Sequence, residues 1–145
     1  MADKKKAYIA GPLFSQAERD FNLQIAEICK EALFDVFLPQ RDAPVLGMLN
    51  ARDVFGAEMH ANEDADLIVA NLDGVDVDSG TAWEIGYAVA RGKSIIGIRT
   101  DWRTFSPHER VNLMIEESAF IVKTLTELRN AVSVWPLGVR ALRRG

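Results

Sequence analysis

The chain has 145 residues, of which 48% are hydrophobic and 26% are charged, and its formal net charge at pH 7 is −4. This composition is typical of a single globular domain, here residues 1–145, and it excludes a membrane-spanning helix, for which roughly 20 consecutive apolar residues are needed. The acidic balance argues against a nucleic-acid partner. The two histidines and one cysteine offer no metal-ligand spacing. The apolar segment 7–10 is too short for the core of a signal peptide, so we expect a cytoplasmic protein.

Strand and helix signals alternate along the chain, as in a parallel sheet with helices on both faces. Short apolar runs predict strands at 7–10, 36–38, 67–72, 94–99 and 120–122. Helical periodicity and start signals predict helices at about 15–33, 50–65, 81–91 and 124–134, and a further one that begins at 106. These five units predict an α/β fold, a three-layer doubly wound parallel sheet with the flavodoxin-like strand order 2-1-3-4-5.

Two predicted helices open with a capping box, in which a serine and a glutamate three residues later satisfy free backbone N–H groups. These boxes are 15–18 and 106–109, the second with a proline in its first turn. The first helix has an apolar stripe at helical spacing, formed by Phe21, Ile25, Ile28, Ala32 and Leu33. Cys29 lies among these residues, so we expect it to fill the core. Pro39 ends the second strand, and a loop is expected over 40–49.

The predicted strand order places a ligand crevice between the first and third strands, beyond their carboxyl ends. Segments 8–14 and 71–78 and the start of the helix at 81–91 converge there. Gly11 and Pro12 end the first strand in a tight lip against which a flat ligand can pack. No glycine-rich dinucleotide motif or P-loop is present, so neither class of nucleotide site is expected.

Glu84 is the residue in this crevice with the clearest chemistry. It follows Thr81 by three residues, so one interpretation is a capping box in which the carboxylate only accepts a backbone N–H. In the other, Glu84 lies in the first turn of its helix, where the helix N-terminus lowers its pKa, and the ionised carboxylate is a nucleophile. Tyr8, on the adjacent strand, can donate a hydrogen bond that orients this carboxylate, although a half-buried strand tyrosine explains the residue as well.

Four blocks of sequence together resemble the nucleoside 2-deoxyribosyltransferase family. They read YIAGPLF at 8–14, ADLIVANLDG at 65–74, DSGTAWEIG at 78–86 and NLM at 112–114. The resemblance spans about residues 7 to 122. It implies transfer of a 2-deoxyribosyl group between nucleobases by double displacement with retention, in which Glu84 attacks the anomeric carbon. The ligands implied are nucleosides and free nucleobases, and no cofactor is required.

The resemblance also implies roles for other residues of the blocks. Tyr8 matches the tyrosine that orients the nucleophile, and Asp78 matches the aspartate that holds the sugar 5′-hydroxyl. Asn112 matches an asparagine that a neighbouring subunit lends to the site, so a homo-oligomer is expected. Related hydrolases of deoxynucleoside 5′-monophosphates carry serines at the positions of Asp78 and Asn112. An aspartate repels a phosphate dianion, so a nucleoside is preferred here over a nucleotide.

The base-binding part of the site departs from the family pattern at one position. The family usually has an aspartate eight residues before the position of Asp66, where this chain has Glu58. A glutamate can exchange a proton with the base, but its extra methylene displaces that proton. Phe14 and the loop after Pro39 are candidates to sandwich the base, although Phe14 also fits a hydrophobic staple for the first helix. Two glycines complete the predicted substrate-binding set, Gly11 and Gly80.

Transfer and hydrolysis differ only in which molecule reaches the glycosyl-enzyme intermediate. The alternative function is therefore an N-glycoside hydrolase that acts on nucleosides or nucleoside 5′-monophosphates. A third interpretation is a nucleotide-binding sensor that has kept the crevice and lost turnover.

Overall fold

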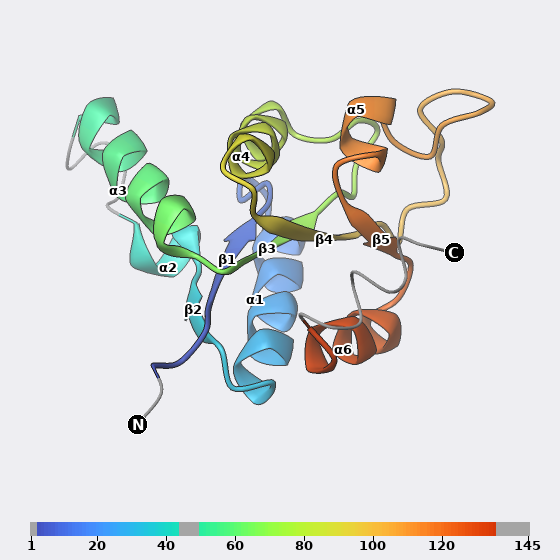
Figure 1. The fold of residues 1–145 in the computed structure, drawn as a ribbon. Coiled ribbons are helices and arrows are strands. Elements are labelled where there is room, and N and C mark those ends of the chain that lie inside the picture. The colour runs from blue at the N-terminus through green and yellow to red at the C-terminus, as the bar shows by residue number, and fades with distance from the viewer. Residues whose placement is uncertain (1–2, 44–49, 136–145) are drawn as a thin grey trace.

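A parallel sheet of five strands organises the described part of the chain, which is residues 3–43 and 50–135 of a computed structural model (Figure 1). The strands lie in the order β2-β1-β3-β4-β5, which confirms the predicted topology. Their bounds are Lys6–Ala10 for β1, Asp35–Phe37 for β2, Leu67–Asn71 for β3, Ser94–Ile98 for β4 and Phe120–Val122 for β5. The helices are α1 Gln16–Glu31, α2 Pro39–Asp42, α3 Ala51–Asp64, α4 Ser79–Ala90, α5 Leu113–Glu116 and α6 Leu125–Ser133.

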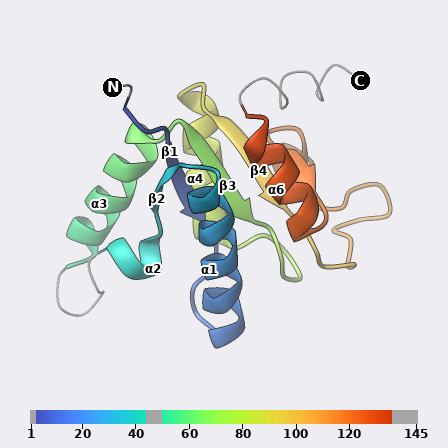
Figure 2. The same cartoon turned by 90° about the horizontal axis from the view of Figure 1, so that it is seen from below.

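Helices cover both faces of the sheet, which gives the three layers that were predicted. α1 and α6 pack side by side on one face, and α3, α4 and α5 lie on the other (Figures 1 and 2). Each face has its own hydrophobic core, and Cys29 is buried in the one beneath α1, as expected. β3 lies between β1 and β4, so every residue of this strand is buried. A strand buried on both faces has a continuous apolar sequence, and this is why β3 was predictable.

The capping box at the start of α1 is confirmed, but the end of the helix differs from the prediction. Ser15 Oγ accepts the N–H of Glu18 at 3.1 Å, and Glu18 Oε1 accepts the N–H of Ser15 at 2.8 Å. α1 ends at Glu31, and Leu33 is exposed with a φ of 69°. The N–H of Phe34 donates to the carbonyl of Cys29 at 3.1 Å, which closes a Schellman turn around the left-handed residue. Phe34 therefore enters the core in place of Leu33.

The start of α4 is the difference that matters most for the site. Asp78 is the N-cap of this helix, and its Oδ2 accepts both the N–H and the Oγ1 hydroxyl of Thr81, each at 3.0 Å. Thr81 is thus the third residue of the helix, and Glu84 lies in the second turn. The interpretation of Glu84 as a capping-box residue was therefore wrong, because the cap position is occupied by Asp78.

The predicted helix start at Ser106 was also wrong. Ser106 and Glu109 close a tight turn, in which the Ser106 N–H donates to the Glu109 carbonyl at 3.1 Å and the Ser106 hydroxyl donates to the Glu109 carboxylate at 2.8 Å. The carboxylate is therefore used within the turn, and α5 begins only after Asn112, its N-cap. The predicted loop over 40–49 begins instead as the short helix α2, and residues 44–49 lie outside the described part of the chain.

Candidate active site

A cavity of about 460 Å³ lies beyond the carboxyl ends of β1 and β3, where the crevice was predicted. This volume is within the usual range for small-molecule sites. The cavity is lined by Gly11, Leu13, Phe14, Arg19, Pro39, Gln40, Ala43, Val54, Glu58, Asp78, Gly80 and Glu84. Six of the eight predicted site residues are in this lining, the exceptions being Tyr8 and Asn112.

A second cavity of about 450 Å³ lies between α3 and α4 and shares three lining residues with the first, Glu58, Gly80 and Glu84. Phe55 and Trp83 supply its aromatic surface, with ring centroids 5.5 Å apart and the rings edge to face. Glu58 and Glu84 therefore face both cavities, which places these two carboxyl groups at the centre of the concave surface.

The carboxyl group of Glu84 is in an environment that favours its neutral form. Burial raises the pKa of Glu84 from 4.5 to about 7, and the charges of Glu58 and Asp78 add to this rise, while the Tyr8 hydroxyl opposes it. The predicted lowering of the pKa by the helix N-terminus was therefore wrong, since Glu84 lies one turn too far along α4 and is desolvated. Near neutral pH this carboxyl group is divided between its ionised and protonated forms.

Tyr8 lies behind Glu84 in the core of the sheet. It is fully buried, and its ring stacks on Phe37 with a centroid distance of 5.5 Å and an interplanar angle of 7°. Burial and the charge of Glu84 raise the pKa of Tyr8, so its hydroxyl stays protonated. Among the described residues, neither the Tyr8 hydroxyl nor Glu84 Oε2 has a hydrogen-bond partner of normal geometry. The buried Tyr8 hydroxyl is thus available to donate a hydrogen bond to the neighbouring carboxyl group of Glu84.

Two further acids face the same cavity as Glu84. Glu58 is half-buried on α3, and burial raises the pKa of its carboxyl group, which favours a protonated side chain that can donate a proton. Asp78 uses Oδ2 to cap α4, and its Oδ1 has no hydrogen bond within the described residues. Phe14 is 75% exposed at the cavity rim, so its ring is available to stack on a ligand.

Asn112 is not close to Glu84 within one chain. Its side-chain oxygen accepts the N–H of Met114 at 3.0 Å, which caps α5. It lines a different cavity of about 490 Å³, between α4 and α5, together with Ile85 and Val89. The role of Asn112 in the site therefore remains a prediction that requires a second copy of the chain.

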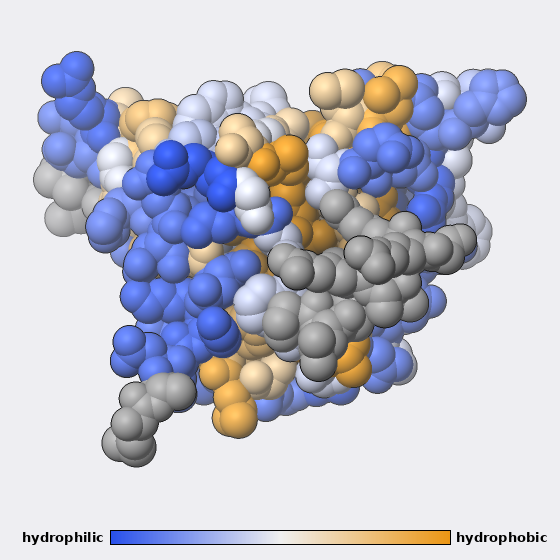
Figure 3. Space-filling model, in the orientation of Figure 1, coloured by the Kyte–Doolittle hydropathy of each residue, from blue (hydrophilic) through white to orange (hydrophobic). Residues whose placement is uncertain are grey.

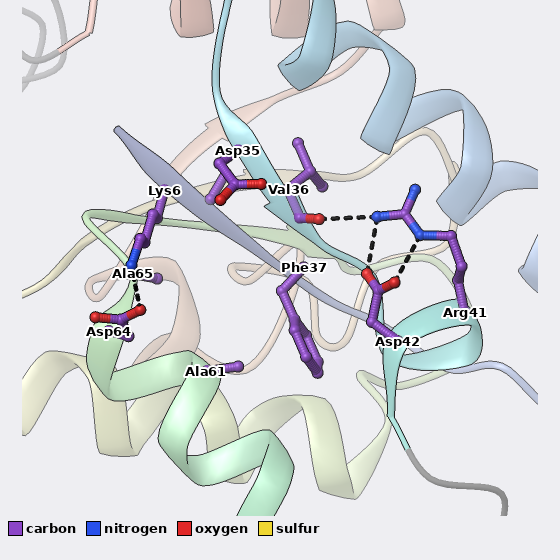
Figure 4. Close-up of a pocket in the computed structure, with 10 residues that line it drawn as sticks. Lys6, Asp35, Val36, Phe37, Arg41, Asp42, Ala61, Asp64 and Ala65 are labelled. Carbon is purple, nitrogen blue, oxygen red and sulfur yellow. Dashed lines mark hydrogen bonds and ion pairs between the residues drawn. The ribbon is translucent and has the colours of Figure 1, made fainter. Parts of the chain in front are cut away.

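A fourth concave region, of about 360 Å³, lies along the edge strand β2 and near the amino ends of β1 and β3 (Figure 4). Four of its charged groups form ion pairs, Lys6 with Asp64 at 2.6 Å and Arg41 with Asp42 at 2.8 Å. Ligands of parallel α/β folds bind at the opposite, carboxyl end of the strands, so we do not place the site here. Within residues 3–43 and 50–135, no helix is long and apolar enough to cross a membrane, and no acid, histidine and cysteine cluster is arranged to hold a metal ion.

The sequence interpretation missed two buried asparagines next to the candidate site. The Asn22 amide donates to the Pro12 carbonyl at 2.8 Å, and the Asn62 amide donates to the Glu84 carbonyl at 3.3 Å. Asn22 interrupts an otherwise apolar helix face that continues with Ile25 and Cys29. A polar residue on such a face is the signal that could have identified it, because buried amides are retained only when they are hydrogen-bonded.

This chain is similar to a known protein family and to several solved structures. Residues 7–125 match the model of the family described as nucleoside 2-deoxyribosyltransferase. An uncharacterized protein of Ureaplasma parvum serovar 3 is 29% identical over 129 residues, 77% of this chain and 80% of that protein. The crystal structure of a conserved protein from Enterococcus faecalis V583 has a TM-score of 0.77 at 27% identity, covering 90% of this chain and 98% of that one.

The 2-deoxyribosyltransferase of Bacillus psychrosaccharolyticus has a TM-score of 0.73 at 24% identity, and the match covers 86% of this chain and 90% of that one. Identity at this level shows a shared fold. The family model, by contrast, matches most of the chain, and residues 7–125 contain all four blocks as well as Glu58. The chain therefore belongs to the nucleoside 2-deoxyribosyltransferase family.

Proposed function

We propose that this protein exchanges nucleobases on 2′-deoxynucleosides, with Glu84 as the nucleophile. The observation that carries the proposal is a desolvated carboxyl group beside a protonated tyrosine, in the wall of a cavity of ligand size. A Glu84 oxygen forms a bond to C1′ of the sugar as the glycosidic bond breaks, and the bonding electron pair leaves with the base. A second base then attacks C1′ and releases Glu84, so the configuration is retained.

The two glutamates that face both cavities fit the two roles that this chemistry needs. Glu84 must be ionised to attack C1′, whereas Glu58 must be protonated to give its proton to the departing base. Burial raises the pKa of both side chains, and the charge of Glu58 raises the pKa of Glu84 further. The charge of Glu58 disfavours ionisation of Glu84, so the proposed roles require that the proton held by the two acids lies on Glu58 when Glu84 attacks the sugar.

Asp78 and Asn112 support a nucleoside substrate and an oligomeric enzyme. The Oδ1 atom of Asp78 has no hydrogen bond among the described residues and can accept one from a sugar hydroxyl, whereas its charge repels a phosphate. Near Asn112, hydrophobic side chains lie on the surface at α5 (Figure 3), where Leu113 and Met114 are exposed. Val89 of α4 is also exposed and lines the same cavity as Asn112. An apolar patch of this kind fits a contact with a second copy that lends Asn112 to the neighbouring site.

An exchange assay tests the proposed function directly. The protein is incubated with deoxyinosine and free adenine, and the products are separated by chromatography. Deoxyadenosine together with hypoxanthine is the expected result. Free 2-deoxyribose without exchanged nucleoside would assign the chain to the hydrolases instead, and the absence of both products would contradict enzymatic turnover of deoxynucleosides.

Two substitutions of Asp78 separate its structural role from its proposed binding role. Asp78→Ser retains a good N-cap, so we expect its unfolding free energy to stay within about 0.5 kcal/mol of wild type, whereas Asp78→Ala loses about 1 kcal/mol. Both variants lose the second carboxylate oxygen, so both are expected to show at least a tenfold lower kcat/KM for deoxynucleosides, by the loss of about one hydrogen bond to a charged group. Full activity in the stable Asp78→Ser variant would contradict a role in substrate binding.

A further inference from the structure

A chain of side-chain amides runs beneath the candidate site from the end of β3 to α2. Asn71 Nδ2 donates to Asn22 Oδ1 at 3.1 Å, and Asn22 Nδ2 donates to the Pro12 carbonyl at 2.8 Å and to Gln40 Oε1 at 3.2 Å. Gln40 Nε2 then donates to the carbonyl of Arg19 at 2.9 Å. Asn22 and Asn71 are each only 2% exposed, while Gln40 lines the cavity. The buried amides therefore connect the sheet to a residue that faces the ligand space.

Backbone groups at both ends fix the direction of every hydrogen bond in this chain. The N–H of Asp73 donates to Asn71 Oδ1 at 3.1 Å, so the Asn71 nitrogen has to face Asn22. At the other end the carbonyl of Arg19 can only accept, so the Gln40 nitrogen has to face it. A backbone N–H cannot accept and a backbone carbonyl cannot donate. The Gln40 amide therefore cannot turn over without breaking the hydrogen bonds on both of its sides.

Gly11 leaves the space that this amide chain occupies. A Cβ atom at position 11 would lie 2.8 Å from Asn22 Oδ1 and 3.0 Å from Asn71 Cβ. Real Cβ atoms rarely approach other atoms so closely, so any side chain at this position would displace Asn22, Asn71 or both. Gly11, which was predicted to form a lip against the ligand, is thus also needed for the contact between Asn22 and Asn71.

We propose that Asn22 and Asn71 are positioning residues that fix which edge of the Gln40 amide faces the ligand, and that they thereby set the choice among nucleobases. The inference rests on the proposed function for the identity of the ligand. Within the described residues, the Gln40 amide keeps one N–H and one oxygen lone pair that no neighbouring group uses. A fixed donor and acceptor distinguish a base with an amino group at C6 from one with a carbonyl group there.

The positioning step is tested without any assay of activity. In NMR spectra of the 16.1 kDa chain, we expect the side-chain amide protons of Gln40 to be shifted and protected from exchange. In Asn22→Ser the Gln40 amide keeps only its hydrogen bond to the Arg19 carbonyl, so these signals should shift and exchange faster. The matched control Gln24→Ser, at an exposed residue of α1, should leave them unchanged. Gln40 signals that are the same in Asn22→Ser and wild type would overturn the proposal.

The selectivity step is tested by the ratio of kcat/KM for adenine and hypoxanthine as acceptors. We expect Asn22→Ser to change this ratio by about fivefold to tenfold, which is the effect of about one hydrogen bond. In a Gln40→Ala background the same substitution should not change the ratio, because it acts through Gln40. Asn71→Ser provides a second variant with the same expectation. A lower melting temperature of the asparagine variants with an unchanged ratio of kcat/KM values would show that Asn22 and Asn71 have only a structural role. If the wild-type protein exchanges no bases, the proposed function is contradicted, but the NMR test of Gln40 positioning still applies.

Discussion

Replacing Glu84 by glutamine is expected to abolish base exchange and, above pH 7, to make the fold more stable. The amide cannot form the bond to C1′, so we expect the rate to fall by about a thousandfold or more. The gain in stability comes from the same side chain, because burial raises the pKa of Glu84 from 4.5 to about 7 in the folded protein. Ionising this carboxyl group therefore costs more in the folded state than in the unfolded one.

The sign and size of the effect on stability follow from proton linkage. The folded state binds more protons than the unfolded state between pH 4.5 and about 7, so the wild type loses stability as pH rises through this window. The shift of the pKa corresponds to about 3 kcal/mol at high pH. Glutamine does not titrate, so the difference in unfolding free energy between Glu84→Gln and wild type should grow by about this amount from pH 4.5 to pH 8.

Urea unfolding at a series of pH values measures this difference, and Glu27→Gln is the control. Glu27 is an exposed glutamate on α1, so the same change there should give a difference that varies little with pH. A Glu84→Gln variant whose stability relative to wild type is flat across this range would show that Glu84 is not desolvated. Exchange activity in this variant near the wild-type rate would separately contradict its role as nucleophile.

The fold was predictable because the patterns that determine it are either local in the sequence or set by the connections between strands. The continuous apolar run of β3 requires burial on both faces, and the capping box at Ser15 was confirmed with both of its hydrogen bonds. Right-handed connections then left few arrangements of five parallel strands. The capping box at Ser106 had the same sequence signature, but its glutamate is bound within a turn and to the N–H of Leu113. A three-residue spacing therefore shows that a cap can form, and the surrounding chain decides whether it does.

Half of the lining of the site was predictable from the blocks at 8–14 and 78–86 that resemble the family, whereas its electrostatics were not. α4 begins at Ser79 and not at Thr81, which takes Glu84 out of the first turn, and burial raises its pKa where the helix N-terminus was expected to lower it. The amide chain through Asn22 and Asn71 was missed for a different reason. Its members are 49 residues apart in sequence, so only the folded chain shows that they meet.

Replacing Arg99 by leucine is expected to destabilise the fold strongly. Arg99 is only 4% exposed, and its guanidinium group donates to the carbonyls of Leu72 and Gly74 at 2.6 and 2.7 Å and to that of Arg103 at 2.7 Å. These bonds join the loop after β4 to the loop after β3 that leads to Asp78. Leucine leaves three carbonyl groups without this donor, and each unsatisfied buried group costs about 1–3 kcal/mol.

We therefore expect Arg99→Leu to lose about 3–5 kcal/mol of unfolding free energy, which lowers the melting temperature by about 10 °C in a domain of this size. Arg99→Lys keeps the charge but has no planar fork to span three carbonyls, so its loss should be intermediate. The control is Arg103→Leu, which removes an exposed ion pair with Asp101 and should cost at most about 1 kcal/mol. If Arg99→Leu is no less stable than Arg103→Leu, the two loops are held by other contacts, and the path from β3 to the Asp78 cap does not depend on this arginine.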